Sequence, residues 1–231
     1  MKSGFDINKI NGDGYLIIPL SMSNLAGKQN PKECYKVLEY FFKKLETYSN
    51  DVILLYTNGL YFNSEEISFE KRKKTNEQMI NHSLEIRRLI ENKKQFMPRA
   101  FHFLPMDYVI LNSPQFTQFF KILKKLELSD TKFKECILID LNGRKYIEAN
   151  INFILEELAI AHILRQQLVE LPKTLVHSDM WRLIVYPGKY LESDLYQWKN
   201  KILPQNKCKN IFSGSQYDFH QKKIFSFDES Q

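Results

Sequence analysis

A succession of strand, loop, helix and strand near the start of the chain restricts the fold more than any other feature. Residues 15–20 form a short apolar run set off by the turn at residues 11–14, and residues 51–57 form a second apolar run that Asn58 and Gly59 end. A helix is expected between them, from about residue 31 to residue 48. Two buried strands joined by a helix make a βαβ unit, whose strands lie parallel in one sheet.

The start of that first helix is unusually well marked. Asn30 is suited to capping, Pro31 to the first helical position, and Glu33 stands where the acid of a capping box belongs. The apolar residues expected to face inward are Val37, Leu38, Phe41, Phe42 and Leu45.

The rest of the chain continues the alternation of strands and helices, so we expect an α/β fold with a Rossmann-like parallel sheet flanked by helices. A long polar helix is expected at residues 68–94, with a thin apolar seam of Ile80, Leu84, Leu89 and Ile90. Further strands are expected at residues 99–104, 174–177 and 183–186, and further helices at 106–111, 114–126, 131–141 and 145–169. The last of these helices is apolar nearly all round, which indicates burial. Residues 1–203 are expected to form a single α/β catalytic domain, and residues 204–231 a polar surface tail.

Composition excludes several classes of protein. The chain has 231 residues, of which 43% are hydrophobic, and a formal charge of +6. Three scattered cysteines without CxxC spacing argue against a disulfide scaffold or a zinc site, and the histidines show no metal-ligand spacing. No apolar leader and no apolar run of 18 residues is present, so we expect no membrane association and a cytoplasmic location. A monomer is expected.

Two residues are candidates for chemistry. Ser21 follows the first strand directly, where open α/β sheets place their ligands, and its loop leads to a helix N-terminus whose N–H groups suit a developing oxyanion. The alternative is an ordinary loop hydroxyl. Glu157 falls within the most apolar helix, where a carboxylate is costly unless paired or functional. The alternatives are a structural salt bridge, or burial of the neighbouring Glu156 instead.

The long polar helix is rich in cations. A run of this kind is usually a solvated face, and the functional alternative is a cradle for an RNA backbone that does not read sequence. The cations that would form such a cradle are Lys71, Arg72, Lys73, Lys74, Arg87, Arg88, Lys93 and Lys94. Motifs of other enzymes are missing, because the chain contains no GxGxxG, no GxxxxGK[ST] and no GxSxG. His177 and Ser178, followed by Asp179, are candidates to relay a proton beside Ser21.

Taken in order, these elements resemble the tRNA-dependent cyclodipeptide synthases, whose fold looks like the catalytic domain of class I aminoacyl-tRNA synthetases. The family's loop pattern Gly-hydrophobic-Ser-x-Gly-Asn corresponds to residues 19–24, in which Ser21 and Asn24 match. Residues 112–116 resemble its mid-chain Thr/Ser-Pro-x-Tyr/Phe segment, and residues 153–160 resemble its signature Tyr-x-x-x-Glu with an apolar run.

The resemblance implies a specific reaction. Two aminoacyl-tRNAs supply activated amino acids, so neither ATP nor another cofactor is expected, and DNA is not a partner. Ser21 would attack the first ester and form an aminoacyl-enzyme, and Glu157 would hold the ammonium group of the substrate. The second aminoacyl group would give a dipeptidyl-enzyme, which cyclises and releases a diketopiperazine.

The sequence departs from the family's pattern in three places. Pro19 and Ser23 replace two glycines, and Phe153 replaces the signature tyrosine. The family's later Tyr-His or Tyr-Pro pair is expected near residues 177–179, where no tyrosine occurs. Two alternatives therefore stay open: a tRNA-binding module that has lost catalysis, and a serine hydrolase built on a similar sheet.

Overall fold

The structure is a computed structural model that describes residues 14–44, 50–59, 63, 68–91, 93, 100–166, 168–169, 181–186, 191–205, 211–218 and 223–225. Its strands are β1 (Gly14–Leu20), β2 (Asn50–Tyr56), β3 (Phe101–Pro105), β4 (Trp181–Tyr186), β5 (Ile211–Asp218) and β6 (Lys223–Phe225). The α-helices are α1 (Pro31–Lys44), α2 (Phe69–Ile90), α3 (Met106–Asn112), α4 (Phe116–Ser129), α5 (Thr131–Leu141), α6 (Glu148–Arg165) and α7 (Glu192–Lys199). Two 3-10 helices, η2 (Met22–Asn24) and η3 (Thr57–Gly59), follow β1 and β2.

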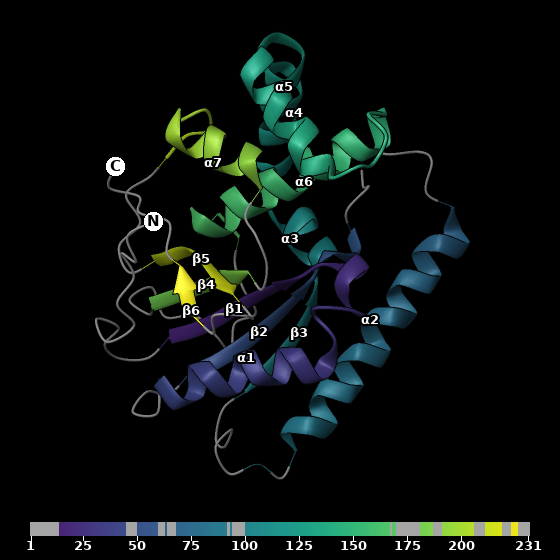
Figure 1. The fold of residues 1–231 in the computed structure, drawn as a ribbon, viewed down its shortest axis with the longest axis vertical. Coiled ribbons are helices and arrows are strands. Elements are labelled where there is room, and N and C mark those ends of the chain that lie inside the picture. Colours follow the sequence, from purple (N-terminus) through teal and green to yellow (C-terminus); the bar gives the residue numbers. More distant parts are fainter. Residues whose placement is uncertain are drawn as a thin grey trace.

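The strands form one sheet in the order β3-β2-β1-β4-β5-β6 (Figure 1). Every neighbouring pair from β3 to β5 is parallel, and β6 pairs with β5 in the antiparallel sense. The chain builds outward from β1 to β3 and then returns to β4 on the other side of β1. The boundary between β1 and β4 is therefore the topological switch point, at whose carboxyl edge ligands of open α/β sheets bind. The Rossmann-like fold predicted from the sequence is confirmed.

Alternate residues of the central strands serve two separate hydrophobic cores. Ile17, Ile53 and Leu55 belong to the core shared with α3, α4, α5 and α6. Leu16 and Ile18 belong to the second core, which contains the apolar face of α1 and Ile86 of α2. Figure 1 shows this arrangement, with α1 and α2 on one face of the sheet and α3 to α7 toward the other.

The start of α1 is confirmed at Asn30 and Pro31, but the capping box is not formed, because the Asn30 N–H donates to the Gly27 backbone oxygen and not to Glu33. The Asn30 side-chain oxygen accepts hydrogen bonds from the backbone N–H groups of Lys32 and Glu33, at 3.0 and 3.1 Å. Glu33 itself pairs with Lys36 at 2.6 Å. Of the residues expected to face inward, Val37, Leu38, Phe41 and Phe42 are buried, while Leu45 lies outside the described residues.

The apolar seam predicted for α2 is wrong at Ile80 and Leu84, whereas Leu89 and Ile90 are half-buried and Ile90 packs against the second core. Ile80 and Leu84 are about half exposed, at 50% and 47%, whereas His82 and Ile86 are the buried residues of this helix. His82 hydrogen bonds to the Tyr56 hydroxyl of β2 at 2.9 Å and to the backbone oxygen of Gln29 at 2.8 Å. Buried hydrogen bonds, which an apolar pattern does not reveal, therefore decide which face of α2 meets the sheet.

The last part of the chain is more regular than expected. The segment predicted as an irregular polar tail contains β5 and β6, which extend the sheet beyond β4. The helix α7 was also not expected, and the predicted strand at residues 174–177 lies outside the described residues. Within the part of the chain that is described, no helix combines the length and apolar character needed to cross a membrane.

Candidate functional site

Ser21 stands directly beyond the carboxyl end of β1, at the switch point. The register pairs Ile17 of β1 with Ile184 of β4, so the two strands run side by side toward this edge. Ser21 is half-buried, has an extended backbone (φ −81°, ψ 125°), and occupies the N-cap position of η2, where its backbone oxygen accepts from the Asn24 N–H at 2.9 Å. Its hydroxyl lies 2.9 Å from that of Ser23. The candidate nucleophile therefore occupies the position at which this sheet topology places ligands.

Two buried side chains hold the Ser21 loop through its backbone. The N–H of Ser21 donates to the side-chain oxygen of Gln29 at 2.7 Å, and the N–H of Met22 donates to the Thr57 hydroxyl at 3.2 Å. Gln29 is fully buried and Thr57 nearly so. Because both N–H groups already have acceptors, they do not supply the oxyanion site expected near Ser21. A developing oxyanion would require other donors.

Tyr186, the last residue of β4, lies next to Ser21 and was not expected from the sequence. Its hydroxyl is within hydrogen-bonding reach of the side chains of Gln29, Ser21 and Asn24. Burial and the nearby Glu157 carboxylate raise the pKa of Tyr186, and the hydrogen bonds from those three side chains oppose the increase only in part. The phenol is therefore neutral at physiological pH and available as a proton donor. The sequence does carry a signal for it, because Tyr186 is followed by Pro187.

Glu157 and Glu156 have different surroundings on α6. Glu156 is fully buried, and one of its carboxylate oxygens accepts hydrogen bonds from the backbone and side chain of Asn63, at 2.6 and 3.0 Å. Glu157 faces a cavity together with Ile160 and Ala161. Burial raises the pKa of Glu157 to about 7, against the opposing effect of the Arg144 guanidinium. Glu156 is thus structural, and Glu157 is the carboxyl group that can exchange a proton near neutral pH.

The cavity beside Glu157, called the inner cavity below, is small and mainly apolar. Its volume is about 70 Å³. It is lined by Pro19, Thr57, Met106, Glu157, Leu158, Ile160, Ala161, Leu164, Arg165, Ile184, Tyr186, Leu191 and Asp194. Tyr186, which hydrogen bonds to Ser21, lines it together with side chains of α6 and β4.

A larger cavity of about 570 Å³, the outer cavity, contains Ser21 itself. One wall is the loop of residues 21–26, a second is α2, and a third consists of Arg144 and Phe153. Its full lining is Ser21, Met22, Ser23, Leu25, Ala26, Pro31, Thr57, Asn58, Lys71, Arg72, Thr75, Gln78, Asn81, His82, Glu85, Arg144 and Phe153. Thr57 also lines the inner cavity, so the two cavities adjoin beside Ser21.

Only part of the predicted cationic set reaches the outer cavity. Lys71 and Arg72 line it, whereas Lys73 and Lys74 are exposed on α2 and do not. Three further cations of the predicted set are described. The Arg87 guanidinium lies 4.6 Å from the centroid of the Phe103 ring, and Arg88 and Lys93 are exposed. Lys94, His177 and Ser178 lie outside the described residues.

Arg144, which was not expected from the sequence, lines the outer cavity together with Lys71 and Arg72 of α2. Its guanidinium carbon lies 5.0 Å from the centroid of the Phe153 ring, and its Nε donates to the Leu141 backbone oxygen at 3.2 Å. Phe153, on the turn of α6 before Glu157, thus carries a cation over its face. The outer cavity is therefore lined by cations from α2 and by Arg144, with Glu85 as an acidic lining residue, and this excess of positive charge suits a polyanion such as the end of an RNA strand.

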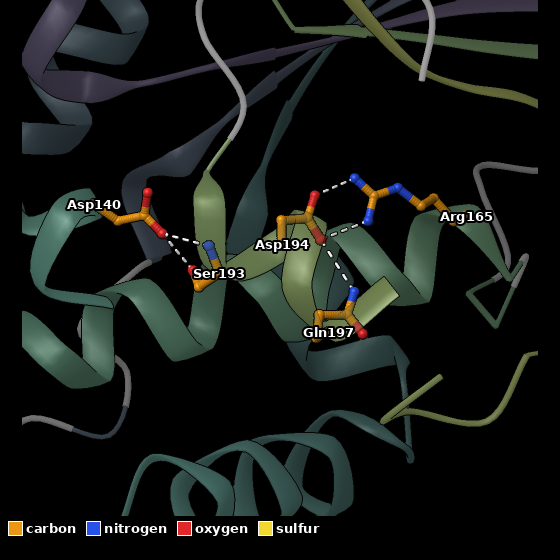
Figure 2. Close-up of polar contacts among 5 residues, drawn as sticks. All are labelled: Asp140, Arg165, Ser193, Asp194 and Gln197. Carbon is orange, nitrogen blue, oxygen red and sulfur yellow. Dashed lines mark hydrogen bonds and ion pairs between the residues drawn. The ribbon is translucent and has the colours of Figure 1, made fainter. Parts of the chain in front are cut away.

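A network of ionic contacts fixes the far wall of the inner cavity (Figure 2). Arg165 of α6 binds both carboxylate oxygens of Asp194 on α7, one of them at 2.7 Å, and Gln197 donates to Asp194 at 3.1 Å. Although burial opposes ionisation, the Arg165 guanidinium holds the pKa of Asp194 below its usual value. The carboxylate of Asp140 accepts from the backbone N–H groups of Glu192 and Ser193, at 2.7 and 2.8 Å, and so caps α7 from α5.

These groups together suit acyl transfer. A serine hydroxyl, a neutral tyrosine and a carboxyl group with a pKa near 7 meet between an apolar cavity and a larger cation-lined cavity. Among the described residues, no group of three or more His, Cys, Asp or Glu side chains is placed to hold a metal ion.

Comparison with known proteins agrees with this architecture. No protein-family model and no curated protein sequence matches the chain. It is similar to the structure of a cyclodipeptide synthase from Fluoribacter dumoffii, with a TM-score of 0.53, 11% identity, and coverage of 84% of this chain and 86% of that one. A cyclodipeptide synthase from Bacillus thermoamylovorans gives a TM-score of 0.53, 13% identity and 86% coverage of both chains.

A third solved structure links this fold to the tRNA synthetases. It is a Mycobacterium tuberculosis protein whose description states that cyclodipeptide synthetases are related to type I tRNA synthetases. It matches with a TM-score of 0.50 and 12% identity, over 86% of this chain and 83% of that one. The chain therefore has the fold of the cyclodipeptide synthases, as the resemblance of its motifs predicted.

Proposed function

We propose that this protein is an aminoacyltransferase that makes a cyclodipeptide from two aminoacyl-tRNAs through an aminoacyl-serine intermediate on Ser21. The observation that carries the proposal is the meeting of Ser21, Tyr186 and Glu157 at the switch point, between the inner and outer cavities. The shared fold supports it, and so does the match of Ser21, Asn24 and Glu157 to the family's motifs.

In the first step, the Ser21 oxygen attacks the carbonyl carbon of the aminoacyl ester. The ester bond to the terminal ribose breaks, the ribose oxygen leaves with a proton, and an aminoacyl ester forms on Ser21. The outer cavity would receive the terminal nucleotides between Arg144 and the α2 cations, and the inner cavity would receive the amino-acid side chain. The ester bonds of the two substrates supply the driving force, so the proposal requires no ATP and no cofactor.

In the later steps, the amine of the bound amino acid attacks the carbonyl carbon of the second aminoacyl-tRNA. The ester bond to its terminal ribose breaks, the ribose oxygen leaves with a proton, and a dipeptidyl-serine forms. The amine of the second residue then attacks the seryl ester, which closes the ring and regenerates the Ser21 hydroxyl. Each amine must lose a proton before it attacks. With a pKa of about 7, Glu157 can bind the ammonium form and also accept its proton. Tyr186 can return a proton to the leaving serine oxygen.

The proposal is tested by incubating the purified protein with aminoacyl-tRNA that carries a radiolabelled amino acid. The wild-type chain should retain label after acid quenching and release a diketopiperazine, and Ser21→Ala should lose both. Ser23→Ala is the matched control, because its hydroxyl lies 2.9 Å from that of Ser21 on the same loop. If Ser21→Ala still retains label, the intermediate does not form on Ser21.

A non-catalytic tRNA-binding module remains the second candidate. The observation in its favour is Phe153, which stands where the resembled family has a tyrosine. Such a module would bind aminoacyl-tRNA with unchanged affinity in Ser21→Ala and would acquire no label in either form.

A further inference from the structure

The inner cavity restricts which amino acid the site can accept. This inference rests on the proposed function, in which the side chain of the first aminoacyl group enters the inner cavity while its carbonyl carbon meets Ser21. Eight of the thirteen lining residues are apolar. The side chain that binds there is therefore desolvated, and an apolar side chain gains most from burial.

The size of the cavity favours aliphatic side chains. Its volume is about 70 Å³. A protein cavity that binds benzene, with six carbons, has a volume of about 150 Å³. The inner cavity has about half of that volume, which is appropriate for about three or four carbon or sulfur atoms. Side chains of this size are those of valine, leucine, isoleucine and methionine. The rings of phenylalanine, tyrosine and tryptophan are too large.

The walls cannot move apart easily. Leu158 and Ile160 of α6 and Ile184 of β4 line the cavity and are at most 9% exposed, and all three belong to the main hydrophobic core. Interiors packed in this way resist the insertion of extra volume, because neighbouring side chains are forced out of their preferred rotamers. An aromatic ring would have to displace these core residues.

The charges in the cavity disfavour charged side chains. Arg165 and Asp194 bind one another through both carboxylate oxygens, so the pair offers little net charge to a ligand. Glu157 would be engaged by the substrate's own ammonium group, and Arg165 is already paired with Asp194, so an aspartate or glutamate side chain would be buried without a cation to pair with. Lysine and arginine side chains exceed the available volume.

We propose that Ser21 accepts an aliphatic aminoacyl group of intermediate size: valyl, leucyl, isoleucyl or methionyl. Alanyl groups would leave the cavity partly empty, and aromatic groups would not enter it. Because one misfitting methylene changes discrimination by about 10- to 200-fold, we expect at least tenfold faster acylation by the best aliphatic donor than by any aromatic or charged donor.

The experiment compares single aminoacyl-tRNAs as donors to the full chain. Purified tRNAs are charged separately with leucine, isoleucine, valine, methionine, alanine, phenylalanine, tyrosine, lysine or glutamate, and the aminoacyl-enzyme is measured by intact-mass spectrometry at short times. An aliphatic donor of intermediate size should give the fastest mass increase at Ser21. An aromatic or charged donor that acylates fastest overturns the inference but leaves the serine intermediate intact. If the folded protein gains mass from none of the donors, both the proposed function and this inference are wrong.

Variants of α6 test the cavity itself. Ile160→Ala removes three carbons from the wall and should raise the ratio of phenylalanyl to leucyl acylation at least tenfold. Ile163→Ala is the matched control, since Ile163 is equally buried on the same helix but does not line the cavity, and it should keep the wild-type ratio. Ala161→Leu, at a half-buried lining position, should abolish leucyl acylation and preserve alanyl acylation. If folded Ile160→Ala and Ala161→Leu both keep the wild-type ratios of acylation by the different donors, the inner cavity does not bind the amino-acid side chain.

Discussion

At the scale of single residues, Gln29 makes hydrogen bonds to three separate parts of the candidate site. Its side-chain oxygen accepts from the Ser21 N–H, which leaves its amide NH₂ group as the donor toward Tyr186. Its backbone oxygen can only accept, so the His82 Nε2 at 2.8 Å carries the proton, and the His82 Nδ1 accepts from the Tyr56 hydroxyl at 2.9 Å. A neutral histidine of one defined tautomer thus connects α2 to the nucleophile loop.

Glu157 should make the stability of the protein depend on pH. Its pKa rises from 4.5 to about 7 on folding, so between these values the folded chain binds more protons than the unfolded chain. The free energy of unfolding should therefore fall as pH rises through this range, by about 3 kcal/mol in total, and should level off above about pH 8. Urea unfolding at pH 5 and pH 8 measures the loss.

The control for this prediction is Glu157→Gln, whose side chain does not titrate. The wild type should lose about 3 kcal/mol more than the variant between pH 5 and pH 8. If the free energy of unfolding falls equally in the two proteins, Glu157 has an ordinary pKa, and its proposed role as a proton acceptor near neutral pH is contradicted.

At the scale of elements, local signals predicted α1 and β1 well because each is determined by its own residues. Asn30 and Pro31 mark the helix start, and a continuous apolar run marks the buried strand. The helix α7 has no such signal. Its first N–H groups are capped by Asp140, about fifty residues earlier in the chain, so only the folded structure brings donor and acceptor together.

The position of Tyr186 illustrates a second limit of prediction from sequence. Both residues 174–177 and residues 183–186 contain apolar residues suited to a strand, and the sequence does not reveal which run lies next to β1. The register of β4 settles this, because Ile184 pairs with Ile17, and Tyr186 then ends its strand beside Ser21. A tyrosine was therefore expected near residues 177–179, whereas the one next to Ser21 comes several residues later.

The helix α2 should contact RNA with one face only. Lys71 and Arg72 line the outer cavity, and Lys73 and Lys74 do not. Replacing Lys71 and Arg72 together with glutamine should weaken aminoacyl-tRNA binding and lower the slope of log K against log salt by about 2, one for each phosphate that is no longer neutralised. Filter binding at several salt concentrations measures both quantities.

The double variant Lys73→Gln/Lys74→Gln is the matched control, because it removes the same charge from the next two positions of the helix, which do not line the outer cavity. Its slope should change by less than half as much as that of the cavity-facing pair. Equal slopes for the two double variants would indicate that α2 attracts RNA only through its total charge.

At the scale of the whole molecule, the sheet and the two helical layers bring the residues of the candidate site together at one edge. Ser21 and Tyr186 come from the carboxyl ends of β1 and β4, Lys71 and Arg72 from the layer on one face, and Glu157 from the layer on the other. The strands β5 and β6 widen the sheet on the β4 side, so β4 is an internal strand with a neighbour on each side. Because β4 is paired on both sides, the end of the strand that carries Tyr186 is held in place.

The contact between α6 and α7 should depend on one buried ion pair. The side chains of Arg165 and Asp194 are 11% and 7% exposed. Asp194→Ala leaves the Arg165 charge buried without its carboxylate, and should lower the free energy of unfolding by about 3–5 kcal/mol. Arg165→Met/Asp194→Leu removes both charges and should recover most of that loss, because well-packed apolar residues can replace a buried pair.

A surface pair provides the contrast for that measurement. Lys36 and Glu33 are 61% and 29% exposed, so Glu33→Gln should lower the free energy of unfolding by no more than about 1 kcal/mol. Urea unfolding of the four proteins gives the comparison. If the double variant is as unstable as Asp194→Ala, the pair contributes through its own attraction. If it recovers, the main role of Asp194 is to neutralise Arg165 at the wall of the inner cavity, where an uncompensated cation would repel the ammonium group of the substrate.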